Sequence, residues 1–125
     1  MTTQRPVFLD ILKLRFPVMA MISICHRLSG IVLFLMLPLV LYLLSASLAS
    51  PQSFAALKVW VHHPGIAFLL WILLTATAFH LLAGFRHLLM DCGLGESLKS
   101  ARLTSYIVLV ATFACAVLLG VWLWA

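Results

Sequence analysis

The stretch "IVLFLMLPLVLYLLSASLA", residues 31–49, contains nineteen residues and no charged side chain. An α-helix of this length extends roughly 28 Å at about 1.5 Å per residue, close to the bilayer's hydrocarbon thickness of about 30 Å. Backbone groups in lipid must be hydrogen-bonded within their own segment, so the stretch is predicted to be a transmembrane helix. Pro38 lies inside it and is expected to bend the helix without excluding it.

Two more runs, residues 64–85 and 104–125, are also uncharged and long enough to span a membrane. In the whole chain 65% of residues are hydrophobic and only 9% are charged, whereas a soluble domain carries about 25% charged residues. We therefore predict an all-α membrane protein, a single transmembrane domain over residues 1–125. Its three transmembrane helices are expected at about residues 18–49, 64–90 and 104–125.

The basic residues predict how the chain is oriented in the membrane. Seven of the eight Lys and Arg residues lie before the first apolar run or around the second loop, and Lys58 is alone in the first loop. The positive-inside rule then predicts a cytoplasmic N-terminus and a periplasmic C-terminus. The net charge of +5 is assigned to topology and lipid headgroups, and nucleic-acid binding is not expected, because no basic cluster with interleaved aromatic residues occurs. The seven basic residues on the predicted cytoplasmic side are Arg5, Lys13, Arg15, Arg27, Arg86, Lys99 and Arg102.

The N-terminal segment mixes charged and apolar residues. It has no short apolar core followed by a small-residue cleavage site, so a cleavable signal peptide is not predicted. We expect residues 5–17 to lie at the membrane surface, with apolar side chains directed inward and Lys13 and Arg15 near the headgroups.

One face of the second predicted helix carries His80, Gly84, His87 and Asp91, within about 40° of one line. His80 is deep, because charge resumes only at Arg86, about 9 Å along the axis. An ionisable residue at such depth indicates a functional site, and neutral imidazole is a good haem-iron ligand. Gly84 would leave room for a flat macrocycle. The alternatives are a histidine hydrogen-bonded to a neighbouring helix and a glycine that allows close helix packing.

The first helix has a matching face. Ser23, His26, Arg27 and Gly30 are at positions i, i+3, i+4 and i+7 and line one stripe. Because a helix over residues 18–49 would be about 48 Å long, this stripe is expected at the cytoplasmic interface. Snorkelling to the headgroups would explain Arg27 alone, but not the serine, histidine and glycine on the same face.

Three blocks of sequence resemble the large cytochrome b membrane-anchor subunit of proteobacterial succinate dehydrogenase, respiratory complex II. They are "RPVFLDILKLRFP" (residues 5–17), "SICHRLSG" (residues 23–30) and "HLLAGFRHLLMDCG" (residues 80–93). The family patterns are Ser-x-x-His-Arg-x-[Ser/Thr]-Gly in the second block and His-x-x-x-Gly-x-Arg-His-x-x-x-Asp in the third. Phe85 departs from the family, which usually has a smaller aliphatic residue there, and it is expected to alter packing near the cofactor.

The resemblance implies half of a heterodimeric haem-binding helical bundle. By position, His80 would be one axial ligand of haem b, and His26 and Arg27 would lie near the haem propionates. Ser23 and Arg27 would line the ubiquinone site. The resemblance gives supporting roles to Gly84, His87 and Asp91.

The resemblance also implies partners in the bacterial inner membrane. A second small three-helix anchor would supply the other haem ligand, and an iron–sulfur subunit and a flavoprotein subunit would deliver electrons from succinate to ubiquinone. This chain would carry no dehydrogenase site of its own. One alternative is a haem-free quinone-binding anchor of a fumarate reductase-type complex. A small transporter would need an acidic residue in mid-membrane, whereas Asp91 and Glu96 follow the predicted span.

Overall fold

The computed structural model describes residues 17–125, so the predicted interfacial segment falls, except for Pro17, outside the described residues. The described part contains four helices and no strand, which confirms the all-α class. Three of the helices are long and apolar enough to cross a membrane, as predicted: α1 (Val18–Ala49), α3 (Pro64–Asp91) and α4 (Leu98–Trp124).

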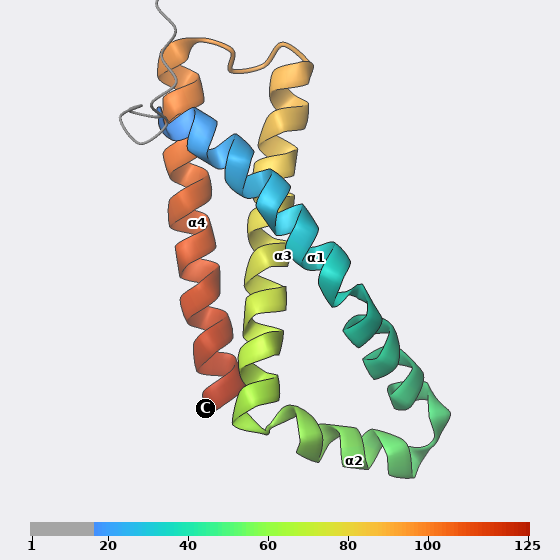
Figure 1. Cartoon of the computed structure of the whole chain (residues 1–125). Helices are drawn as coiled ribbons and strands as arrows, with labels where there is room; N and C mark the ends of the chain where they lie inside the picture. Colours follow the sequence, from blue (N-terminus) through green and yellow to red (C-terminus); the bar gives the residue numbers. More distant parts are fainter. Residues whose placement is uncertain (1–16) are drawn as a thin grey trace, which may run out of the picture.

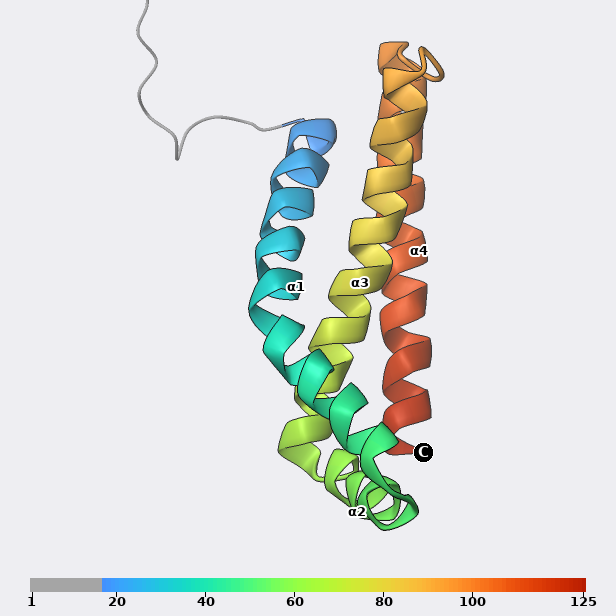
Figure 2. The same ribbon diagram turned by 90° about the vertical axis from the view of Figure 1, so that its right-hand side faces the viewer.

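The longest helix, α1, follows Pro17, whose backbone is extended, and has no side-chain cap. Pro38 lies inside α1, where it cannot donate a backbone hydrogen bond. Figure 2 shows the axis of α1 bending along its course. A proline inside a transmembrane helix is a common cause of such a bend.

A short helix, α2 (Pro51–Val61), occupies the segment that the sequence interpretation had treated as a loop. Its start has two features that favour helices: the Ser50 side chain accepts a hydrogen bond from the Ser53 backbone at 3.0 Å, and Pro51 is at the first helical position. Eleven residues extend only about 16 Å, so α2 is too short to be a fourth span.

The two helices α3 and α4 lie side by side and antiparallel (Figures 1 and 2). Residues 92–97 connect them, and within this connection Gly93 and Gly95 have positive φ angles of 79° and 76°. The side chain of Ser97 then accepts a hydrogen bond from Ser100 N at 3.2 Å, so α4 begins at Leu98, earlier than the expected start near residue 104. We call the end of the bundle that contains residues 92–97 the turn end.

The position of α1 relative to the other helices determines where a site can form. Starting at the turn end, α1 crosses α3 and then diverges from it, and α2 bridges the resulting gap at the opposite end (Figure 1). The small core lies near the crossing and contains Ile22, Ala83 and Val108, with Phe79 and Leu82 packed against it.

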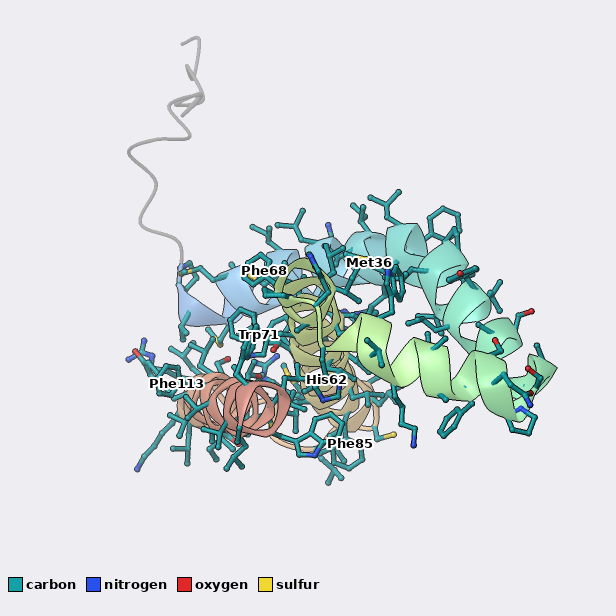
Figure 3. The ribbon with its side chains drawn as sticks, turned by 90° about the horizontal axis from the view of Figure 1, so that it is seen from below. Met36, His62, Phe68, Trp71, Phe85 and Phe113 are labelled. Atoms are coloured by element: carbon teal, nitrogen blue, oxygen red, sulfur yellow. The ribbon has the colours of Figure 1, made fainter. Side chains whose placement is uncertain are left out.

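Most of the large apolar side chains are on the outside. Phe34, Leu48 and Phe113 are 73%, 77% and 72% exposed. Phe85 is also exposed, and Figure 3 shows the side chains of Phe85 and Phe113 projecting away from the helices. An apolar surface of this extent fits contact with lipid and with other membrane-embedded chains.

Candidate functional site

Two histidines meet where α1 crosses α3. The rings of His26 and His80 are stacked, with centroids 4.1 Å apart and an angle of 18° between the ring planes. Both side chains are half-buried. One residue from each of the two predicted polar faces therefore lies against the other in this structure.

The hydrogen bonds of His80 come from α1. Its Nδ1 atom lies 2.9 Å from Ser29 Oγ and 3.2 Å from the backbone oxygen of His26. Ser29 is itself buried, and its hydroxyl donates to the same His26 oxygen at 2.8 Å. Within residues 17–125, no hydrogen bond reaches the other ring nitrogen of His80, Nε2.

Two glycines make the close crossing possible. A Cβ atom on Gly30 would lie 3.2 Å from His80 Cε1, and a Cβ atom on Gly84 would lie 3.2 Å from His26 Nε2. Each of these distances is tighter than an ordinary Cβ contact. The space left by Gly84 thus accommodates the His26 ring in this structure, which is the close-packing role.

The Nε2 atom of His26 has no hydrogen-bond partner in the described part of the chain, although it is buried. A third histidine, His87, lies nearby, with its ring centroid 5.3 Å from that of His26. Buried polar atoms are nearly always hydrogen-bonded in native proteins. An unpartnered imidazole nitrogen beside two other imidazoles therefore points to a ligand or another chain at this position.

The remaining predicted residues are not part of this cluster. Ser23 is half-buried on α1, Arg27 is exposed on α1, and Asp91 is exposed at the end of α3. Within residues 17–125, no hydrogen bond or ion pair joins any of them to the histidines. Arg27 is exposed and makes no hydrogen bond within residues 17–125.

Sequence reasoning missed three buried polar residues, which are Ser29, Arg86 and Ser105. Ser29 follows His26 by three residues and shares its side of the helix, a spacing that could have identified it. Arg86 is only 5% exposed; its Nε donates to Thr104 Oγ1 and its Nη2 to the Ala101 oxygen, both at 3.1 Å. These bonds connect α3 to α4. Arg86, the first charged residue after the apolar run, therefore forms a contact between two helices.

The residues at the crossing fit haem better than a bare metal ion. Within residues 17–125, no group of three or more His, Cys, Asp and Glu residues could hold a metal ion. Haem needs only axial ligands from the protein, since its macrocycle supplies the other four nitrogens. His80, held through Nδ1 with no hydrogen bond on Nε2 within residues 17–125, fits one such ligand.

Fold and site together define a polytopic membrane protein with a cluster of histidines where two of its spanning helices cross. The chain belongs to the succinate dehydrogenase/fumarate reductase transmembrane subunit family, whose model matches residues 1–119. This confirms the resemblance found in the sequence and makes the chain part of an oxidoreductase complex.

Three curated relatives agree with the family. The succinate dehydrogenase cytochrome b556 subunit of Coxiella burnetii is 50% identical over 125 residues, covering 99% of this chain and 100% of the relative. The cytochrome b556 subunit of Paracoccus denitrificans is 33% identical over 118 residues, covering 91% and 88%. The cytochrome b560 subunit of Reclinomonas americana is 30% identical, covering 90% and 82%.

Proposed function

We propose that this chain is the large cytochrome b anchor of a succinate dehydrogenase. It holds haem b together with a second membrane subunit and forms part of the ubiquinone site. It also attaches the iron–sulfur and flavoprotein subunits to the membrane. Succinate oxidation releases two electrons and two protons, and ubiquinone reduction consumes the same numbers.

The arrangement of His80 is the observation that carries the proposal. Its ring is attached to α1 through Nδ1, at 2.9 Å from Ser29 Oγ, while Nε2 makes no hydrogen bond within residues 17–125. A histidine that binds haem iron does so through one ring nitrogen and donates a hydrogen bond from the other ring nitrogen to an acceptor in the protein. His80 would accordingly hold the haem iron from this chain.

When bound, haem b supplies a one-electron redox centre between the soluble donor and the membrane. His26 contributes its unpartnered Nε2 atom and Arg27 its exposed guanidinium as donors toward the haem propionates. Gly84, His87 and Asp91 are supporting residues: Gly84 allows the helices to approach, and the other two extend the polar face toward the turn end.

Ser23 and Arg27 form this chain's wall of the ubiquinone site. Both are on the polar stripe of α1, and Arg27 has no partner within the described residues. A hydroxyl and a guanidinium donate hydrogen bonds to a quinone carbonyl and stabilise the negative charge that develops on its oxygen. The quinone itself is lipid-soluble, so it is met at the bilayer.

The partners follow from what this chain lacks. The other haem ligand would come from the second anchor subunit, a small three-helix protein that would cover part of the exposed apolar surface. The turn end faces the cytoplasm, because seven of the eight basic residues lie on that side. The soluble subunits therefore dock there, on the inner membrane of a bacterium.

A reduced-minus-oxidised absorption spectrum of the purified complex tests the proposal. Wild-type complex and the variant His62→Leu, which changes an exposed histidine at the α2 end, should give the same b-type spectrum. His80→Leu should lose the low-spin, six-coordinate signature in electron paramagnetic resonance. An unchanged signal in His80→Leu would mean that iron is held elsewhere.

One observation favours the second candidate, a haem-free quinone-binding anchor of the fumarate reductase type. His80 is stacked on His26 and hydrogen-bonded to Ser29, and these contacts with α1 also fit a histidine whose role is helix packing. The same spectrum decides between the two candidates, because a haem-free anchor gives an assembled, quinone-reducing complex with no b-type band.

A further inference from the structure

Ser29 is buried between α1 and α3, 8% exposed, one turn after His26. Its hydroxyl carries a single hydrogen. That hydrogen is donated to the His26 backbone oxygen at 2.8 Å. At 2.9 Å from His80 Nδ1, Ser29 Oγ therefore presents a lone pair to the histidine and not a proton.

A second oxygen faces the same nitrogen. The His26 backbone oxygen lies 3.2 Å from His80 Nδ1, and a carbonyl oxygen can only accept. An unprotonated Nδ1 would face two sets of lone pairs, so the arrangement requires a hydrogen on Nδ1. Since a neutral imidazole carries one N–H, Nε2 is the bare nitrogen and is the one available to a metal.

Gly30, which follows Ser29, determines how closely the His80 ring approaches α1. A Cβ atom on Gly30 would lie 3.2 Å from His80 Cε1, so only glycine allows the ring to lie this close to α1. The two oxygens determine how the ring is rotated, and Gly30 determines how near the backbone it lies.

We propose that Ser29 is a positioning residue for His80: it keeps the hydrogen on Nδ1 and directs Nε2 toward iron. This inference rests on the proposed function, in which His80 is an axial ligand. An acceptor on Nδ1–H makes the opposite nitrogen a stronger donor, which favours ferric over ferrous iron. Loss of the Ser29 oxygen should consequently raise the haem reduction potential and weaken haem retention, by about tenfold from the usual effect of such partners.

The test uses the purified complex with Ser29→Ala, Ser29→Thr and Ser29→Cys. Ser47→Ala is the matched control, because Ser47 makes the same kind of bond, to the Leu44 oxygen at 2.7 Å, but contacts no histidine. The measurements are the potentiometric midpoint of the haem band, the low-spin resonance signal and the rate of haem loss to an external acceptor.

In Ser29→Ala we expect a higher midpoint potential, an altered resonance signal and haem loss about tenfold faster. Ser29→Thr, which keeps the hydroxyl, should stay near wild type, as should Ser47→Ala. If Ser29→Ala does not assemble, Ser29→Cys should show the same shifts, since a thiol is a weak acceptor.

Two results separate this inference from the proposed function. If His80→Leu abolishes the haem signal but Ser29→Ala or Ser29→Cys leaves all three measurements unchanged, Ser29 has no positioning role. If wild-type complex contains no haem, or His80→Leu leaves its signal unchanged, the proposed function fails, and this inference fails with it.

Discussion

His26 lies against Gly84, and His80 lies in the same way against Gly30. In each helix the histidine precedes the glycine by four residues, so the two helices present the same His-x-x-x-Gly pattern to one another. Each glycine provides the space that the other helix's histidine fills. The crossing is therefore reciprocal, with two imidazoles stacked between two backbones.

A bulky residue at Gly84 should disrupt this crossing. The variant Gly84→Leu places side-chain atoms where His26 Nε2 now lies, 3.2 Å from the first added carbon. Overpacking of this kind costs roughly 1–3 kcal/mol. We expect a lower thermal midpoint of the purified complex and an altered haem spectrum, although no ligand is removed.

The control for this variant is Gly65→Leu, at the α2 end. A Cβ atom there would meet His63 at an ordinary contact distance of 3.5 Å, and Gly65 is exposed. If Gly84→Leu matched Gly65→Leu in both thermal midpoint and spectrum, the reciprocal packing would not matter to the site.

Removal of the Arg27 guanidinium should impair quinone reduction and leave assembly intact. Arg27 is exposed and has no partner within residues 17–125, so Arg27→Leu breaks no contact inside the described chain. A hydrogen bond from a charged group is worth about 1.5–3 kcal/mol, so ubiquinone reduction should fall by at least about tenfold. Succinate oxidation with a soluble artificial acceptor should persist.

Two variants accompany Arg27→Leu in the same assay. Ser23→Ala should have a milder effect, because it removes one neutral hydrogen bond worth about 0.5–1.5 kcal/mol. Arg102→Leu removes an exposed arginine from α4 at the same end and should leave quinone reduction unchanged. Normal quinone turnover in Arg27→Leu would remove this residue from the ubiquinone site.

Arg86 should matter to stability. Its two hydrogen bonds to Thr104 and Ala101 connect α3 to α4. The variant Arg86→Ala loses both bonds, so we expect a loss on the order of 2–3 kcal/mol in the free energy of unfolding. The measurement is the thermal midpoint of the complex in detergent, with Arg102→Ala, an exposed arginine, as the control. Equal midpoints for the two variants would argue against a connecting role.

Reporter fusions test the orientation. The basic residues predict that a reporter fused after Ser97, at the turn end, is cytoplasmic. Reporters fused after Pro51 or after Ala125 should be periplasmic, because one spanning helix, α3 or α4, separates each of them from Ser97. A periplasmic Ser97 fusion would reverse the orientation and place the ubiquinone site on the other side.

Much of the fold was predictable because three apolar runs are directly visible in the sequence, and lipid admits few structures other than helices. The apolar pattern does not predict the short helix α2, although Ser50 and Pro51 form a favourable start, because α2 is too short to span. The pattern also places the start of α4 too late, because a helix extends past its apolar part, here through Lys99 and Arg102, where a cap such as Ser97 favours it.

The site was predictable to the level of helix faces. Periodicity placed His26 and His80 on the polar faces of their helices, where the structure has them. The contact of Ser29 with His80 depends on how α1 crosses α3, and a crossing is a property of two helices that neither sequence segment contains by itself. The burial of Arg86 against α4 has the same origin.

The scarcity of buried side chains has a consequence for biogenesis. Only five hydrophobic residues in the described chain are buried, and three of them are alanines: Ile22, Ala67, Ala83, Ala101 and Val108. A newly inserted copy consequently has little internal packing to stabilise it before it meets its partners, and it still contains a buried His26 nitrogen that has no hydrogen-bond partner within residues 17–125. Membrane proteases and chaperones that monitor orphan subunits would find such a copy easy to unfold, so its lifetime in the cell should depend on co-synthesis of the rest of the complex.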